Sequence, residues 1–213
     1  MDTLFDCVII GGGPAGLNAA LILGRARKDV ILIDDNNPRN AVTQESHGFI
    51  TRDGIKPKEF KEIAHKELGR YPSVMYTKRK VTSVIRNNSL FELVTSDNEL
   101  YQSKTIIIST GLKDVLPRIE NISDYYGKSL FHCPYCDGWE LRDKPLVVII
   151  GEQVQGFHFF VDSFGRTNIK GIYSAGDASV ITPAQIIIAA AEGVRAAAGV
   201  NTDLTQVEFL EYT

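Results

Sequence analysis

The first third of the chain alternates short apolar runs with segments of helical length. Leu4–Ile10 is an apolar run of strand length, and after a cluster of glycines Leu17–Arg27 has helical length and few β-branched residues. Asp29–Ile33 is a second apolar run, which two aspartates follow. Short apolar runs bounded by turn residues are typical of strands buried on both faces of a parallel sheet. The pattern predicts a strand, a helix and a parallel strand in that order.

The next stretch adds one helix and several strands. Residues 57–70 have the pattern of an amphipathic helix that begins at Pro57, and we expect its Lys and Glu side chains to be solvated. Residues 74–102 alternate as short strands with Asn-rich turns, and Lys104–Ile108 is another buried strand.

The last third predicts two strands and a long helix. Pro145–Gly151 is an apolar run of strand length, and Gly171–Asp177 is a strand that ends in a glycine and an acid. Thr182–Gln185 has the pattern of a capping box, with Pro183 at the first helical position. An Ala-rich helix follows over Ile186–Ala198.

Length and composition limit the classes of protein. The chain has 213 residues, 44% of them hydrophobic, and a net charge of −3, enough for one large domain or one domain and a fragment. Interspersed charges argue against nucleic-acid binding. No apolar stretch reaches the roughly 18–20 residues of a transmembrane helix. The run Cys7–Ile10 leads into glycines and not into a cleavage site, so we expect no signal peptide and a cytoplasmic protein.

The glycine cluster has the spacing of a dinucleotide-binding turn. Gly11 permits a tight turn, Gly13 lets the backbone approach a pyrophosphate, and Gly16 lets the helix pack close to the strand. The phosphates would lie at the positive end of the helix. Asp34 follows about 20 residues later, where a carboxylate can bind ribose hydroxyls. The motif alone does not separate FAD from NAD.

Two of the three cysteines lie three positions apart. Cys133 and Cys136 in a cytosolic protein indicate redox chemistry or half of a metal site, whereas Cys7 stands in a buried strand and is expected to be inert. Zinc needs four ligands, and His132 and His158 are the only further candidates nearby, so we predict no metal site.

Several motifs occur together in the order of one known family. The stretches VIIGGGPAG, IISTG, CPYCDG and GIYSAGD, followed by TPAQ, cover the chain from Asp6 to about Ala198. With them the chain resembles the low-molecular-weight thioredoxin reductases. This resemblance implies an α/β, Rossmann-like FAD/NAD(P)-binding fold, with a parallel sheet, helices and an accessory β-meander. The FAD domain would be split into residues 1–116 and 157–213, with residues 117–156 as the redox loop and a remnant of an NADPH-binding domain.

The resemblance also implies which residues contact FAD. Asp34 matches the acid that binds the adenosine ribose, with Asp35 as a neighbour, and Asp177 matches the carboxylate that hydrogen-bonds the ribityl chain. The backbone amides of Gln185 and Ile186 match those that face the flavin pyrimidine ring. The full expected set is Gly11, Gly13, Pro14, Ala15, Gly16, Asp34, Asp35, Asn40, Thr110, Gly111, Gly176, Asp177, Gln185 and Ile186.

For the redox pair the resemblance implies three roles. Cys136 is the cysteine that faces the flavin, Cys133 exchanges with the substrate, and Asp137 is the acid–base residue beside them. A thiolate is the nucleophile in such exchange, and Cys-x-x-Cys spacing at a helix start lowers its pKa. A buried carboxyl with a raised pKa can return a proton to a leaving thiolate.

One departure from the family concerns NADPH. A nucleotide-binding domain needs about 100–150 residues, but only residues 117–156 stand where the family has its NADPH domain. The motif expected after Gly151 is missing. NADPH is therefore the electron donor that the resemblance implies, while its site is largely absent here.

Three functions stay open from the sequence. The first is a reductase whose partner is a thioredoxin-like protein or a small dithiol or disulfide. The second is a dithiol oxidase that uses oxygen, because Pro38–Asn40 and His47–Gly54 are similar to a sister group that includes such oxidases; Asp137 favours the reductases, since a His is common there in the oxidases. The third, suggested by the abrupt Gly151–Phe157 junction, is a truncated, non-catalytic flavin-binding module. The family also implies a homodimer.

Some conspicuous side chains have simpler interpretations. We expect His47 to be a hydrogen-bonded structural residue and His65 to be solvated. Phe131, Tyr135 and Trp139 flank the redox pair, and we expect them to pack and not to form a substrate platform.

Overall fold

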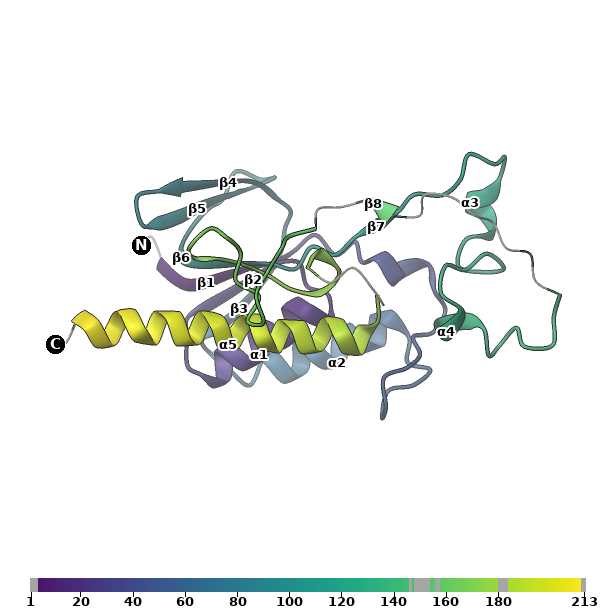
Figure 1. The fold of residues 1–213 in the computed structure, drawn as a ribbon, viewed down its shortest axis with the longest axis horizontal. Coiled ribbons are helices and arrows are strands. Elements are labelled where there is room, and N and C mark those ends of the chain that lie inside the picture. The colour runs from purple at the N-terminus through teal and green to yellow at the C-terminus, as the bar shows by residue number, and fades with distance from the viewer. Residues whose placement is uncertain (1–3, 146, 148–153, 156–157, 180–183, 212–213) are drawn as a thin grey trace.

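One mixed sheet forms the centre of the computed structural model, which describes residues 4–145, 147, 154–155, 158–179 and 184–211 (Figure 1). Its strand order is β3-β2-β1-β6-β5-β4, and β9 pairs with β6. Five of the strands pair in parallel: β1 (Leu4–Ile10), β2 (Val30–Asp34), β3 (Val74–Lys78), β6 (Leu100–Ile108) and β9 (Ile172–Ser174). Two more, β4 (Val81–Asn87) and β5 (Leu90–Thr95), form an antiparallel hairpin that continues through β6.

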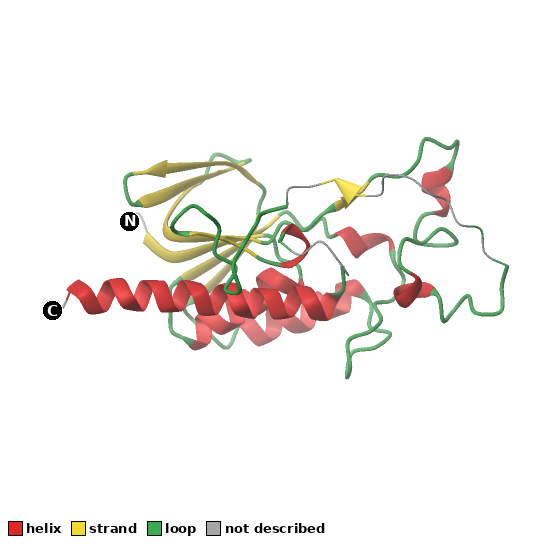
Figure 2. Cartoon of the chain, in the orientation of Figure 1, coloured by secondary structure: helices red, strands yellow, loops and turns green. Residues whose placement is uncertain are grey.

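Three longer helices cover one face of this sheet, and the β4–β5 hairpin stands on the other side (Figures 1 and 2). They are α1 (Pro14–Arg25), α2 (Pro57–Leu68) and α5 (Ile186–Glu211). Short helical turns occur at η1 (Arg39–Val42), α3 (Ile122–Tyr125), α4 (Pro134–Asp137) and η2 (Gly176–Ala178). The parallel strands with helices, and the antiparallel hairpin beside them, confirm the predicted fold class.

The core is built where α1 and α5 meet the sheet. Ile9, Leu32 and Leu23 are fully buried between the sheet and these helices, and each such side chain contributes about 1.5–3 kcal/mol by leaving water. A Cβ on Gly193 of α5 would overlap the carbonyl oxygen of Ala15 in α1. The two helices therefore touch backbone to backbone, which fixes the start of α1 relative to the sheet.

Several boundaries were predicted correctly and some were not. The strand β1 has the predicted bounds, and Asn88 and Asn98 have positive φ in the two predicted turns. The last helix continues to Glu211, well past the predicted end at Ala198. Gly199, which resembles a stop signal, lies instead where α5 passes close to the carbonyl oxygen of Phe164, so it serves packing.

Two predicted features fall outside the described residues in whole or in part. The strand predicted over Pro145–Gly151 is described only at Pro145 and Val147, neither of which has regular structure. In the predicted capping box, Thr182 and Pro183 lie outside the described residues. The segment from residue 117 onwards leaves the sheet and carries α3 and α4 to the far end of the molecule (Figure 1).

The two ends of this segment are joined by a short antiparallel ladder. The two-residue strand β7 (Lys113–Asp114) pairs antiparallel with β8 (Val154–Gln155).

Among the described residues, no helix combines the length and the apolar character needed to cross a bilayer.

Candidate functional site

A cavity of about 750 Å³ lies at the carboxyl ends of the parallel strands. The turns after β1, β2, β6 and β9 supply its floor, and the start of α5 and part of the redox segment, residues 126–139, supply its walls. Ligands of open α/β sheets bind in this position. The predicted residues that line it are Gly11, Gly13, Pro14, Ala15, Asp34, Asp35, Asn40, Thr110, Gly111, Cys136, Asp137, Gly176, Asp177, Gln185 and Ile186. Gly16 and Cys133 do not line it.

The three glycines of the turn occupy different surroundings. Gly11 has φ +104°, and a Cβ there would overlap the carbonyl oxygen of Ser109. A Cβ on Gly16 would overlap the carbonyl oxygen of Gly11, so α1 lies directly against the turn. A Cβ on Gly13 would meet nothing within 4 Å. Of these three glycines, Gly13 is the one that presents open backbone to the cavity.

The start of α1 fits a phosphate group. Gly13 is the N-cap of the helix and Pro14 follows it, and no side chain caps the first turn. The first amides of a helix have no partner within the helix, and their positive end attracts anions. A diphosphate is the group that this uncapped, glycine-lined helix start can hold.

Asp34, the last residue of β2, lines another part of the cavity with only 6% of its surface exposed. Lys61 of α2 donates a hydrogen bond to its carboxylate and a second one, of 2.6 Å, to Asn36. Burial raises the pKa of Asp34, but the bonds from Lys61 and the Gly12 amide outweigh this and hold that pKa below its usual range. Asp34 thus stays an ionised acceptor suited to ribose hydroxyls.

Lys61 corrects the prediction that the charged side chains of α2 are solvated. Its side chain is only 15% exposed because it reaches over to Asp34. His65, one turn further on, was also expected in solvent. Its ring lies 4.2 Å from that of Tyr76, its Nε2 is buried without a hydrogen-bond partner among the described residues, and burial lowers its pKa. This face of α2 is covered because Asp34, at the end of β2, and Tyr76 of β3 lie against it.

Replacing Lys61 by Met tests the state of Asp34. Folding lowers the pKa of Asp34, so Asp34 stabilises the folded chain at pH values above its unfolded pKa, which is near 4. This stabilisation is lost as the pH falls through the lower pKa of the folded state. Without Lys61 the buried carboxylate keeps only backbone amide donors and no opposite charge, so we expect unfolding to cost on the order of 2 kcal/mol less at pH 7. The deficit should shrink toward pH 4, where Asp34 takes up a proton.

Urea unfolding at both pH values measures this difference. Lys58→Met is the matched control, because Lys58 lies on the same helix and its partner Glu62 is exposed. An equal loss of stability in both variants, or a Lys61→Met deficit that does not change with pH, would contradict the assignment.

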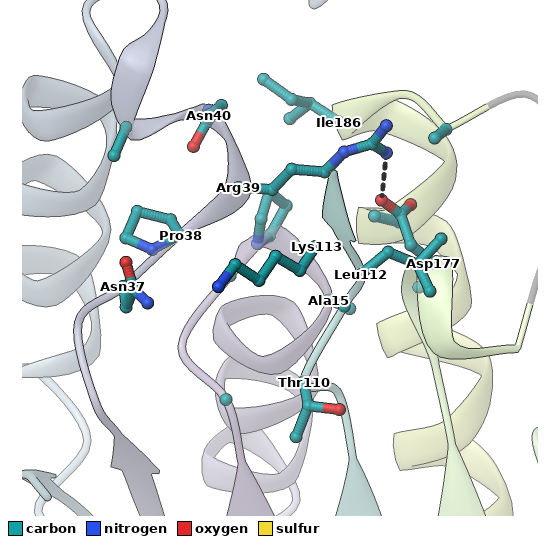
Figure 3. A pocket seen from close by; sticks show the side chains of 18 of the residues that line it. Ala15, Asn37, Pro38, Arg39, Asn40, Thr110, Leu112, Lys113, Asp177 and Ile186 are labelled. Carbon is teal, nitrogen blue, oxygen red and sulfur yellow. Dashed lines mark hydrogen bonds and ion pairs between the residues drawn. The ribbon is translucent and has the colours of Figure 1, made fainter. Parts of the chain in front are cut away.

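Arg39 is a site residue that the sequence did not single out, although Pro38–Asn40 was noted as a stretch. Its guanidinium bridges two acids. It donates to both oxygens of Asp114 at 2.6–3.0 Å, and Figure 3 shows its contact of 3.3 Å with Asp177. Burial lowers the pKa of Arg39, but the bonds to Asp114 outweigh it and the net direction is upward. These partners stand 75 and 138 residues away, so no local pattern reveals them.

The predicted redox pair forms a disulfide, and its two cysteines have different surroundings. Cys133 and Cys136 are bonded across the short helix α4, with 5.3 Å between their Cα atoms. Only Cys136 lines the cavity, together with Asp137, whose pKa burial raises. Cys7 is fully buried, which confirms its predicted place in the core, and burial raises the pKa of its thiol to about 12, as expected of an inert thiol.

The aromatic residues around the disulfide were predicted wrongly in part. Tyr135 and Trp139 are 82% and 73% exposed, while Phe131 is half-buried. Tyr135 and Trp139 do not pack in the core, because the redox segment lies away from it; Trp139 instead lies 4.5 Å from the guanidinium of Arg142. His47 lines the cavity within 3.5–3.9 Å of three carboxylates, those of Asp53, Glu45 and Glu140, which fits a structural role joining its loop to the redox segment.

Comparisons with known proteins point in one direction. Residues 5–156 match the family described as Pyridine nucleotide-disulphide oxidoreductase. Thioredoxin reductase aclD of Aspergillus oryzae is 36% identical over 150 residues, which are 69% of this chain and 48% of that protein. A thioredoxin reductase of Gibberella zeae is 33% identical over 182 residues, 70% of this chain and 53% of that protein. The chain spans about half the length of these curated relatives.

A solved structure agrees with them. The crystal structure of a protein named as thioredoxin reductase TrxB from Bacillus anthracis is 36% identical, with a TM-score of 0.88. The match covers 96% of this chain and 99% of that one.

Proposed function

Because this chain belongs to the pyridine nucleotide-disulphide oxidoreductase family, we propose that it is a thiol–disulfide oxidoreductase of the thioredoxin reductase type. It passes electrons between bound FAD, the Cys133–Cys136 pair and an external disulfide or dithiol. Reducing the pair takes two electrons and two protons and gives two thiols; FAD, when bound, is the two-electron carrier. The rest of the chemistry belongs to side chains of this chain.

One observation carries the proposal: the cavity joins a phosphate-binding turn to a disulfide. The uncapped helix start at Gly13 and the buried acid Asp34 line one cavity with Cys136. A dinucleotide with its diphosphate at Gly13 and a ribose at Asp34 has its remaining half directed along the cavity. Such a ligand would bring a redox ring toward Cys136 and leave Cys133 outside, open to a partner.

The remaining predicted contacts fit the same arrangement. Asp177 lines the cavity, where its carboxylate can accept hydrogen bonds from ligand hydroxyl groups; burial raises its pKa, and such bonds would offset that burial. Gln185 and Ile186 stand at the start of α5, a helix of 26 residues, whose positive end would stabilise negative charge on a reduced ring. Asp137, with its raised pKa, can store the proton that a leaving thiolate needs.

A dithiol oxidase is the second candidate. Its distinguishing step converts a dithiol into a disulfide, and oxygen takes up the two electrons and two protons as hydrogen peroxide. The loop His47–Gly54 favours it, because this stretch is similar to the oxidases and His47 lies at the cavity wall within 3.9 Å of Glu140, which directly follows the redox segment. This reaction needs no nicotinamide site.

Visible spectra of the FAD-loaded chain test the proposal. We expect the flavin absorbance to bleach when a dithiol such as dithiothreitol is added without oxygen, and to return when a disulfide or oxygen is admitted. Bleaching by NADPH would show that hydride donation survives in this chain. Oxygen consumption with dithiol alone would favour the oxidase. A flavin that stays unbleached by dithiol would refute both candidates and leave a binding module.

Partner, assembly and compartment follow from the same proposal. The partner is a thioredoxin-like protein or a small dithiol or disulfide, since Cys133 lies outside the cavity. A homodimer is supported by apolar side chains that α5 exposes, among them Ile187 and Val194, although most of its buried face packs on α1. Cytoplasmic placement fits a protein whose third cysteine, Cys7, is an unpaired thiol.

A further inference from the structure

The guanidinium of Arg39 holds its two acids unequally. It forms a fork on Asp114, with three contacts of 2.6–3.0 Å, but only one contact, of 3.3 Å, with Asp177. The side chains of Arg39 and Asp114 are 16% and 6% exposed. A buried bidentate pair of this kind is rigid and specific in direction. Asp114 therefore anchors the arginine, while Asp177 keeps oxygen lone pairs directed at the cavity.

Asp114 extends the contact toward the disulfide. The Tyr126 hydroxyl donates a hydrogen bond to Asp114 Oδ2, and the same hydroxyl lies 3.3 Å from His132 Nδ1. Since the Tyr126 proton is directed at Asp114, its oxygen is left to accept from an Nδ1–H of His132. Burial, and then the charge of Arg39, lower the pKa of His132, so the ring is neutral and can adopt this tautomer.

His132 immediately precedes Cys133, so the connected side chains reach from one cavity wall to the redox pair. The path runs from η2 through η1 and β7 to the redox segment. The described part of the redox segment also touches η1, where a Cβ on Gly127 would overlap the carbonyl oxygen of Val42, and His47 lies near Glu140 just after it. The side chains around the disulfide add little, since Tyr135 and Trp139 are exposed and α4 contains no buried residue.

We propose that Arg39 is a positioning residue: through Asp114 and Tyr126 it holds the redox segment against the cavity, and through Asp177 it makes that placement sensitive to FAD. The second half rests on the proposed function. Arg39 does not react; it sets where Cys136 stands. Because binding at Asp177 and placement of the segment share one guanidinium, each must affect the other.

A second cluster in the chain supplies an internal control. Arg166 donates to both oxygens of Asp203 at 2.7–2.8 Å and to Asp162 at 3.3 Å, and Tyr173 donates to Asp203 at 2.6 Å. The chemistry repeats that of Arg39, Asp114, Asp177 and Tyr126, but none of these residues lines the cavity. Arg166→Met thus reproduces the loss of stability that follows from breaking such a cluster, but at a place away from the cavity.

The first arm of the test uses the chain without FAD. Hydrogen–deuterium exchange is measured over residues 126–139, where the amides of Cys136, Asp137 and Gly138 are bonded within α4. Arg39→Met and Tyr126→Phe should each speed this exchange about tenfold, the effect of losing one or two buried hydrogen bonds. Arg166→Met should leave it as in the wild type. Equal exchange in all four chains would overturn the proposal.

The second arm adds FAD and uses Trp139, the chain's single tryptophan, as a reporter. We expect Arg39→Met to weaken FAD binding about tenfold and, at saturating FAD, to reduce the quenching of Trp139 fluorescence. Tyr126→Phe should reduce the quenching while keeping FAD affinity within about threefold, because the Arg39–Asp177 contact survives. Unchanged quenching in both variants would refute the coupling.

Arg39→Lys separates geometry from charge. Lysine keeps the positive charge but cannot form the fork, so exchange in the redox segment should stay fast. Full rescue by lysine in both arms would overturn a positioning role. If the wild type bound no FAD, the proposed function would fail, while the exchange measurement would still decide whether Arg39 holds the segment.

Discussion

Cys136→Ser is expected to abolish electron exchange between thiols and the flavin, lowering the rate of flavin bleaching by dithiols by at least about 10³-fold. Cys136 is the member of the pair that lines the cavity, whereas Cys133 lies outside it. A serine hydroxyl cannot supply the thiolate that such exchange requires. Stopped-flow absorbance of the FAD-loaded variant measures the rate.

Cys133→Ser is the matched partner in this experiment. It also stops turnover, because one thiol cannot close a disulfide, but it leaves the cavity-facing thiol in place. Bound FAD should then shield Cys136 from alkylation by iodoacetamide, whereas in Cys136→Ser the remaining Cys133 should react equally with and without FAD. Bleaching at the wild-type rate in Cys136→Ser, or the reverse protection pattern, would contradict the assigned orientation.

The second large effect separates binding from folding within one glycine turn. Gly13 has an ordinary φ of −76°, and a Cβ there enters open cavity. Gly13→Ala should therefore fold with a stability within about 1 kcal/mol of the wild type, because the reduced entropy of the unfolded chain offsets the poorer N-cap, while the methyl group keeps a diphosphate away from the helix start. We expect FAD binding about 10- to 100-fold weaker, which corresponds to about 1–3 kcal/mol.

Gly16→Ala should show the opposite pattern. Its Cβ would overlap the carbonyl oxygen of Gly11, so α1 must move away from the turn. We expect unfolding to become easier by about 1–3 kcal/mol, a fall in Tm of roughly 2–4 °C for each kcal/mol. Thermal unfolding without FAD and FAD titration at a temperature where both variants are folded measure the two effects. Loss of stability in Gly13→Ala with normal FAD binding would reverse the assigned roles.

Local patterns in the sequence were enough to predict many of the residues in the cavity floor. The glycine turn and Asp34 could be placed because turn geometry, helix starts and strand ends are set by residues a few positions apart. The same holds for the disulfide, whose cysteines are three residues apart. Of these residues, the structure brings Gly11, Gly13, Asp34 and Cys136 to one cavity, while Gly16 and Cys133 lie outside it.

The sequence could not reveal what depends on distant partners. Arg39 resembles any surface arginine until the chain brings Asp114 and Asp177 to it, and Lys61 belongs to a charged helix until β2 presents Asp34. The packing of Trp139 was predicted wrongly for a different reason. Large aromatic residues are usually buried, but this one lies in a segment that extends away from the core.

The ladder between β7 and β8 is a position at which the chain can accept an inserted segment. The polypeptide leaves this ladder after Lys113–Asp114 and comes back beside the same two residues, at Val154–Gln155. The entropy of closing a loop between such neighbouring ends grows slowly, by about 0.6 kcal/mol for each doubling of its length. Whatever is spliced in at this point, long or short, leaves the sheet nearly as stable as before. Grafting a foreign domain between these strands should therefore preserve the host.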